Sequence, residues 1–79
     1  MRVTVKLFGP ERRAANTDSV KIDVPEGASC ADVRAVLADV HSALAEPHTR
    51  FAVNQRFVTD DHVLAPGDEI ALIGLVSGG

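Results

Sequence analysis

Alternation of hydrophobic and polar residues near the N-terminus predicts two β-strands. The alternating segments cover residues 2–8 and 19–24. In both, every second side chain is apolar, as in a strand with one buried face; these side chains are Val3, Val5 and Leu7, then Val20, Ile22 and Val24. Gly9-Pro10 ends the first strand, and the polar or small residues 11–17 predict a loop with room for one helical turn. The pair is expected to form a hairpin with a long connection.

After Ser29 the apolar period changes from that of a strand to that of a helix. One apolar stripe recurs at helical spacing, formed by Val33, Val36, Leu37, Val40 and Leu44. The Ser29 side chain is expected to cap the helix, with Asp32 three residues later in the place of the usual capping-box glutamate. Pro47 is expected to stop the helix.

The C-terminal part predicts three short strands, at residues 51–53, 56–58 and 69–73. Turn signals separate them, namely Asn54-Gln55, Asp60-Asp61-His62 and Pro66-Gly67-Asp68. This order of elements predicts an α+β domain in which one mixed sheet packs on a single main helix. The first and last strands are expected to be adjacent and parallel, because their long connection contains the helix. Residues 1–73 form this domain, and residues 74–79 are expected to be a flexible tail.

The last predicted strand is apolar on both faces. Ile70 and Leu72 point to one side, and Ala71 and Ile73 point to the other. A single helix covers only one side of a sheet, so some apolar side chains should remain exposed; the candidates are Phe8, Ala71, Ile73, Leu75 and Val76. An exposed apolar patch beside a tail is typical of a docking surface. The alternative is that these side chains fold back on their own loops.

Length, charge and cysteine content exclude several classes of protein. The 79 residues suffice for one small domain, and a single cysteine rules out an internal disulfide and indicates the reducing cytoplasm. The net charge is −3, and the basic residues are scattered rather than gathered on one face, which argues against nucleic-acid binding. No apolar run has the length of a membrane span, and no leader peptide is recognised.

Few residues have the pattern of a catalytic or metal site. His41, His48 and His62 share no ligand spacing with one another or with Cys30, so no metal is expected. No catalytic triad, glycine-rich nucleotide loop or carboxylate pair is present, so the isolated chain is not expected to be an enzyme.

Cys30 and two arginines are open to more than one interpretation. The helix dipole would make Cys30 more reactive, whereas the nearby acidic residues oppose this, and a small residue at a helix start is the simpler interpretation. Arg12 and Arg13 on the first loop are expected to be solvated, the alternative being contact with acidic residues of a partner.

The sequence closes on Ser77-Gly78-Gly79. Glycines have no side chains to pack and lose much backbone entropy on ordering, so they form a poor structural ending. Without a Cβ they can enter a narrow channel and present the Gly79 carboxylate to an enzyme, with Gly78, Ser77 and Val76 threading behind it. Extended fully, residues 74–79 would reach about 20 Å.

A glycine pair at the end of such a domain resembles the ubiquitin-like sulfur carriers of the MoaD/ThiS family, which have a β-grasp fold. Within the family the chain is similar to the small subunit of molybdopterin synthase, the MoaD type. The resembling segments span essentially the whole chain: Leu7-Phe8-Gly9, Glu11-Arg12-Arg13, Ala52-Val53-Asn54-Gln55, Asp61-His62, Leu64, Gly67-Asp68-Glu69 and Val76-Ser77-Gly78-Gly79. One departure is that Gly74 and Leu75 replace the two prolines common before the tail, which would stiffen its exit.

The resemblance implies a chemistry that partners carry out on Gly79. A ubiquitin-activating-type adenylyltransferase (MoeB type) would use ATP and Mg²⁺ to adenylate the Gly79 carboxylate, and a persulfide protein would convert it to a thiocarboxylate. The tail would then enter the large synthase subunit (MoaE type) and give sulfur to cyclic pyranopterin monophosphate, forming molybdopterin. No cofactor would be bound by the chain itself. Phe8, Ala71, Ile73 and Leu75 would contact the partner, and a heterotetramer is implied.

Three other functions remain open on the sequence. A carrier for the thiazole of thiamine would use the same activation but a different synthase. A ubiquitin-like protein modifier would join Gly79 to a lysine of a target. A plain β-grasp interaction module would keep all its activity without the two glycines.

Overall fold

The computed structural model describes residues 1–46 and 48–74. Within these residues, five strands and three helical segments follow one another. The segments are β1 (Arg2–Leu7), α1 (Gly9–Ala15), β2 (Ser19–Asp23), α2 (Cys30–Val40), the 3₁₀ helix η1 (Ser42–Ala45), β3 (Thr49–Val53), β4 (Arg56–Val58) and β5 (Ile70–Gly74).

The strands form one mixed sheet in the order β2-β1-β5-β3-β4. β1 and β5 run parallel at its centre, and the other neighbours are antiparallel. The predicted adjacency of the first and last strands is therefore confirmed. Because β5 is central, its residues 70–72 are held between β1 and β3, and its last residue, Gly74, pairs with Thr49 of β3.

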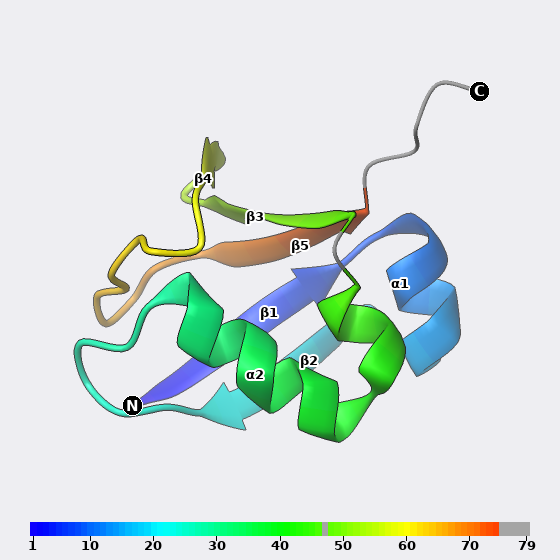
Figure 1. Cartoon of the computed structure of the whole chain (residues 1–79), viewed down its shortest axis with the longest axis horizontal. Helices are drawn as coiled ribbons and strands as arrows, with labels where there is room; N and C mark the ends of the chain where they lie inside the picture. The colour runs from blue at the N-terminus through cyan, green and yellow to red at the C-terminus, as the bar shows by residue number, and fades with distance from the viewer. Residues whose placement is uncertain (47, 75–79) are drawn as a thin grey trace.

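Helix α2 lies across one face of the sheet and closes the core (Figure 1). Val33 and Leu37 of α2 are fully buried, and full burial of one such side chain is worth about 1.5–3 kcal/mol. The sheet contributes alternate residues to the same core: Val3, Val5, Leu7, Ile22, Phe51, Val53, Ile70 and Leu72. Ser29 caps the helix in the expected way, since its hydroxyl accepts from the Asp32 N–H at 3.3 Å while Asp32 accepts from the Ser29 N–H at 2.9 Å.

Residues 9–15 form a helix, which corrects the predicted loop. Gly9 has a φ of +57° and turns the chain out of β1, and Pro10 stands at the first turn of α1, where its missing N–H costs nothing. Gly9-Pro10, which ends β1, therefore also begins helix α1. Arg12 and Arg13 consequently lie on the last turn of α1 rather than on a loop.

The main helix is shorter than predicted. α2 ends at Val40, where the backbone of His41 becomes extended, and η1 follows. The His41 ring nitrogen Nδ1 accepts from the Ala43 N–H at 3.2 Å and starts the new turn. Val40 is 53% exposed and leaves the apolar stripe, whereas Leu44 is buried from η1. Pro47 therefore does not end the main helix.

The predicted turns between the last strands are confirmed, and two of them are tied together. Asn54 and Gln55 both have positive φ, as the tight turn between β3 and β4 requires. The Asn54 amide donates to Asp68 at 3.0 Å, and Asp68 also accepts from the Ala65 N–H at 2.8 Å. These two donors, with the Ala65 backbone first, lower the pKa of the Asp68 carboxyl. The turn before β5 is thus fixed against the β3–β4 turn.

Candidate functional site

The sheet face opposite α2 carries a row of side chains across four strands. Register pairs Lys6 with Ala71, Ala71 with Ala52, and Ala52 with Phe57. Residues paired in this way point to the same side of a sheet. The two alanines at the centre of the row have small side chains, so the surface of this face is concave between Lys6 and Phe57.

A hollow of about 320 Å³ occupies this low part of the face. Its lining is largely apolar, and it comprises Lys6, Phe8, Ala52, Gln55, Phe57, Glu69, Ala71 and Ile73. Phe8 is 49% exposed and Phe57 is 59% exposed. Two half-exposed aromatic rings beside an apolar floor are the composition that protein interfaces favour at their centre.

Three of the residues predicted for a partner interface lie together here. Phe8, Ala71 and Ile73 all line the hollow. Leu75 and the threading residues Val76, Ser77, Gly78 and Gly79 fall outside the described residues.

Two apolar residues that line the hollow were not predicted from the sequence. Ala52 and Phe57 belong to strands too short to show a clear alternation. The available signal was the spacing of Phe51, Val53 and Phe57 across the Asn54-Gln55 turn. A two-residue hairpin places Ala52 opposite Phe57, on the side away from the buried Phe51.

Charged groups stand at the rim of the hollow. Lys6 Nζ lies 3.4 Å from Glu69 Oε1, and both side chains are more than half exposed. A pair this exposed contributes little to stability. It leaves a lysine and a carboxylate available to a partner at the edge of an apolar centre.

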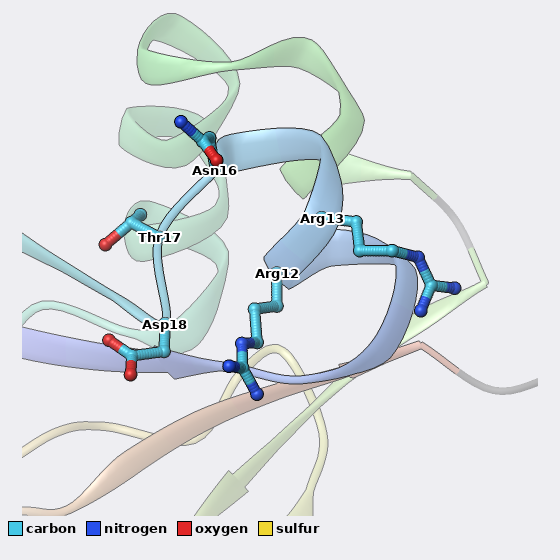
Figure 2. Close-up of a pocket in the computed structure, with 5 residues that line it drawn as sticks. All are labelled: Arg12, Arg13, Asn16, Thr17 and Asp18. Carbon is cyan, nitrogen blue, oxygen red and sulfur yellow. The ribbon is translucent and has the colours of Figure 1, made fainter.

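A second hollow, at the end of α1, is polar and open (Figure 2). It is lined by Arg12, Arg13, Asn16, Thr17 and Asp18. The two arginine side chains extend in different directions rather than converging on a common point (Figure 2). Within residues 1–46 and 48–74, no salt bridge joins either guanidinium to another side chain. The arrangement is that of solvated surface arginines rather than of a built anion site.

Cys30 is completely buried at the start of α2. Burial, followed by the negative charge of Asp60, raises the pKa of its thiol to about 11. The helix dipole therefore does not activate this cysteine, in agreement with its interpretation as a small residue at a helix start.

We expect the Cys30 thiol to resist a disulfide reagent in the folded protein. At pH 8 a thiol with a pKa near 11 is ionised in about one molecule in a thousand, against about one in ten for an ordinary thiol with a pKa of 9.0. Absorbance titration with Ellman's reagent should show slow reaction in buffer. In about 6 M guanidinium, a typical denaturing concentration, the reaction should be full and rapid. Rapid stoichiometric reaction of the native protein would contradict this expectation.

Among the described residues, no group of three histidine, cysteine or acidic side chains is placed to hold a metal ion. No helix in the described part of the chain combines the length and apolar character needed to cross a bilayer.

Comparison with known proteins decides the family. The model of the ThiS family matches residues 5–79, which is nearly the whole chain. The chain belongs to the ThiS family. Proteins of this family are small carriers rather than catalysts, and the predicted resemblance is confirmed at this level. No curated protein sequence matches the chain.

The solved structures similar to this ThiS-family chain include molybdopterin converting factor subunits and archaeal modifier proteins. SAMP1 of Haloferax volcanii is 29% identical, with a TM-score of 0.84 over 100% of both chains. A Pyrococcus furiosus protein described as subunit 1 of a molybdopterin converting factor is also 29% identical, with a TM-score of 0.84 over 96% of this chain and 99% of the other. The chain is thus a ThiS/MoaD-type sulfur carrier or a SAMP-like modifier.

A third structure shows such a protein with its partner. It is the complex of subunits 1 and 2 of the molybdopterin-converting factor of Helicobacter pylori, at 25% identity and a TM-score of 0.70 over 100% of both chains. A ubiquitin of Caldiarchaeum subterraneum, 21% identical with a TM-score of 0.69, shares the fold. The predicted ubiquitin-like β-grasp fold is therefore confirmed.

Proposed function

We propose that the chain is the sulfur-carrying small subunit of a molybdopterin synthase, with the Gly79 carboxylate as its reacting group. The match to the ThiS family carries the proposal, because it runs through residue 79 and includes the terminal Gly78-Gly79. The similarity to the molybdopterin converting factors of P. furiosus and H. pylori supports the choice of product. The single, buried cysteine suits a protein that works in the cytoplasm.

The reaction would proceed on Gly79 in three steps. A carboxylate oxygen attacks the α-phosphorus of ATP on the activating enzyme, which holds Mg²⁺, and pyrophosphate leaves. Sulfur from a persulfide protein then attacks the carbonyl carbon, AMP leaves, and reductive cleavage of the sulfur–sulfur bond by a thiol yields the thiocarboxylate. A carboxylate is a poor electrophile, and adenylation supplies the leaving group that it lacks.

The open sheet face would dock the carrier while the tail reaches the reacting centre. Phe8, Ala71 and Ile73 would pack on the large subunit, and Leu75 would extend that contact toward the tail. Holding the thiocarboxylate inside a partner's channel replaces a bimolecular encounter by an oriented one and excludes water from the activated group. The partner would there transfer the sulfur to cyclic pyranopterin monophosphate, and Gly79 would return to a carboxylate.

The second candidate function is protein modification, favoured by the similarity to SAMP1 over the full length of both chains. Activation of Gly79 would be shared, and a lysine amine would then attack the acyl group and form an isopeptide. A carrier for thiamine thiazole is the third candidate and would differ only in the acceptor enzyme.

Intact mass spectrometry tests the proposal. The untagged protein is incubated with the adenylyltransferase of its own organism, ATP, Mg²⁺ and a persulfide donor, with a parallel sample lacking ATP. A mass gain equal to one oxygen replaced by one sulfur, only with ATP, is expected. Adding the large subunit and cyclic pyranopterin monophosphate should reverse the gain and yield molybdopterin. Loading without that transfer, together with isopeptide-linked species in lysate, would favour the modifier instead.

A Phe8 variant tests the docking face. Phe8→Ser should weaken binding to the large subunit by about tenfold or more, because a half-exposed aromatic at the centre of an interface is a typical hot spot. Val40→Ser is the matched control, since Val40 is similarly exposed but stands on α2, on the covered side of the sheet. Isothermal titration calorimetry measures both. Equal affinities for the two variants would remove Phe8 from the interface.

A further inference from the structure

Basic residues that are scattered along the sequence come together on the open sheet face, which is the side of the sheet opposite α2. In β1 and β2 alternate residues enter the core, so the residues between them point to the open sheet face. In β3 the side chain of Phe51 is buried in the core, so its neighbour Arg50 points the other way. The basic residues placed on the open sheet face in this way are Arg2, Lys6, Lys21 and Arg50.

The open sheet face is cationic, although the chain as a whole is anionic. Its four basic residues face only two carboxylates there, those of Asp23 and Glu69, which gives this face a formal charge of +2. The whole chain carries −3, so all other positions together carry −5. Arg12 and Asp18 line a neighbouring hollow and cancel one another. Residues 47 and 75–79 have no charged side chain.

Acidic residues lie on the opposite side of the molecule. Helix α2 covers that side of the sheet (Figure 1) and carries Asp32 and Asp39. Asp60 is held against the same helix by Arg34, whose Nε lies 2.8 Å from Asp60 Oδ2. The molecule therefore has a cationic open sheet face and an anionic helical side.

Two of the four cations on the open sheet face are already paired there. Arg2 Nε lies 3.2 Å from Asp23 Oδ1, and Lys6 Nζ lies 3.4 Å from Glu69 Oε1. Among the described residues, no salt bridge involves Lys21 or Arg50. Both of these side chains are exposed. Lys21 and Arg50 are therefore the cations that this face offers to another molecule.

Lys21 and Arg50 lie on different sides of the apolar hollow. Lys21 belongs to β2 and is a diagonal neighbour of Lys6, which lines the hollow. Arg50 belongs to β3, where it pairs with Ile73 and stands two residues from Ala52, and both of these residues line the hollow. A positive charge thus borders the apolar centre on each side.

Protection of a sheet edge explains only one of the two cations. Lysine on an edge strand discourages pairing with another chain, and β2 is such a strand. Arg50 lies on β3, which has β5 on one side and β4 on the other, so it protects no edge. Its place beside an apolar floor is that of a charged residue at the rim of a protein interface.

We propose that the open sheet face selects a partner protein that carries carboxylates around an apolar centre, and that Lys21 and Arg50 meet those carboxylates. The inference rests on the proposed docking of the large subunit on this face and names the chemistry of that subunit's surface. Long-range attraction draws the cationic face toward the acidic partner and turns the anionic helical side away, which speeds association in the productive orientation. Single-stranded nucleic acid fits less well, because Asp23 and Glu69 on the same face repel phosphate groups.

Two variants of equal net charge separate local attraction from overall charge. Lys21→Gln/Arg50→Gln removes two positive charges from the open sheet face. Ala35→Glu/Ala38→Glu adds two negative charges at exposed positions of α2 and is the matched control. Stopped-flow mixing with the fluorophore-labelled large synthase subunit of the same organism gives kon and koff at each salt concentration. Circular dichroism confirms that each variant is folded.

For the unchanged chain we expect kon to fall about tenfold or more between about 20 mM and about 500 mM NaCl. At the lower salt, kon of Lys21→Gln/Arg50→Gln should be about fivefold below that of the unchanged chain, with koff within about twofold. The α2 variant should keep kon within about twofold. At the higher salt the three rates should converge, because screening removes the long-range attraction.

Three outcomes would contradict the proposal in different ways. Equal kon for the two variants at low salt, or a kon that ignores salt, would overturn this inference and leave the proposed function intact. Failure of the unchanged chain to bind the large subunit would refute the proposed function, and this inference with it. Binding of a polyuridine oligonucleotide that is lost in Lys21→Gln/Arg50→Gln would assign the face to nucleic acid instead.

The charge asymmetry is also testable without any partner. Nuclear magnetic resonance measures how strongly a negatively charged nitroxide relaxes each amide proton, compared with a neutral nitroxide of similar size. The excess relaxation by the anionic probe should be larger for the amides of β2 and β3 than for those of α2, because anions gather at the cationic face. Equal excess on the two sides would overturn the charge asymmetry on which the proposal depends.

Discussion

Replacing Arg34 by alanine should destabilise the domain by about 3 kcal/mol, a large part of the stability of a domain this small. The Arg34 guanidinium binds both carboxylate oxygens of Asp60, at 2.8 and 3.1 Å. It also donates to Thr49 Oγ1 at 2.6 Å and to the Thr49 carbonyl at 3.1 Å. Its central carbon lies 5.0 Å from the centroid of the Phe51 ring.

These contacts join three parts of the fold through one side chain. Arg34 belongs to α2, Thr49 begins β3, and Asp60 lies in the turn after β4. Thr49 is 2% exposed, so its carbonyl would lose a donor without gaining water. Asp60 is about half exposed and would be resolvated, which keeps the expected loss below that of a fully buried ion pair.

Urea unfolding followed by circular dichroism measures the effect of Arg34→Ala. In thermal unfolding of the same variant, a Tm about 15 °C lower is expected for a loss of this size. Arg34→Lys should give an intermediate loss, because an ammonium keeps the charge but cannot bind both groups with a planar fork. Arg56→Ala, on the exposed β4, is the control and should be nearly neutral. A loss in Arg34→Ala no larger than in this control would show that the network contributes little.

Deleting Gly79 should abolish sulfur loading and leave the fold unchanged. The deletion leaves a carboxylate on Gly78, one residue short of its place, which is a displacement of about 3.5 Å. Misplacement of a reacting group by even about 1 Å can cost about a hundredfold in rate. None of the buried core residues in the described chain lies beyond Leu72, so stability should not change.

Mass spectrometry of the loading reaction checks this prediction. Gly79→Ala keeps the chain length and adds one methyl, and it should load at least about tenfold more slowly if the channel accepts only glycine. A C-terminal tag should block loading, and an N-terminal tag should not. Loading of the Gly79-deleted chain at the unchanged rate would exclude the carboxylate of Gly79 as the reacting group.

The sequence predicted the sheet well, because its signals are local and repeated. Alternation in β1 and β2 and the turn residues between β3, β4 and β5 act over a few positions each, and the structure follows them. The parallel pairing of β1 with β5 followed from the helix between them. The end of α2 was missed because Val40 and Leu44 continue a helical period, although the extended backbone of His41 interrupts it.

The candidate site was predictable only in part. Phe8, Ala71 and Ile73 were found because one helix cannot cover two faces of a sheet. The short helix α1 was not predicted, because Gly9-Pro10 is a pair that indicates the end of a strand. Without α1, Glu11 is one more polar residue in a loop, and only the folded chain shows that its carboxylate lies against Gly74.

The position of β5 also bears on how the protein is made. The central strand of the sheet is the last of the described strands to be synthesised. While β5 is still inside the ribosomal exit tunnel, β1 and β3 have no strand between them. The core therefore closes only after β5 has left the tunnel, and a nascent chain that stops before β5 stays unfolded and open to proteolysis.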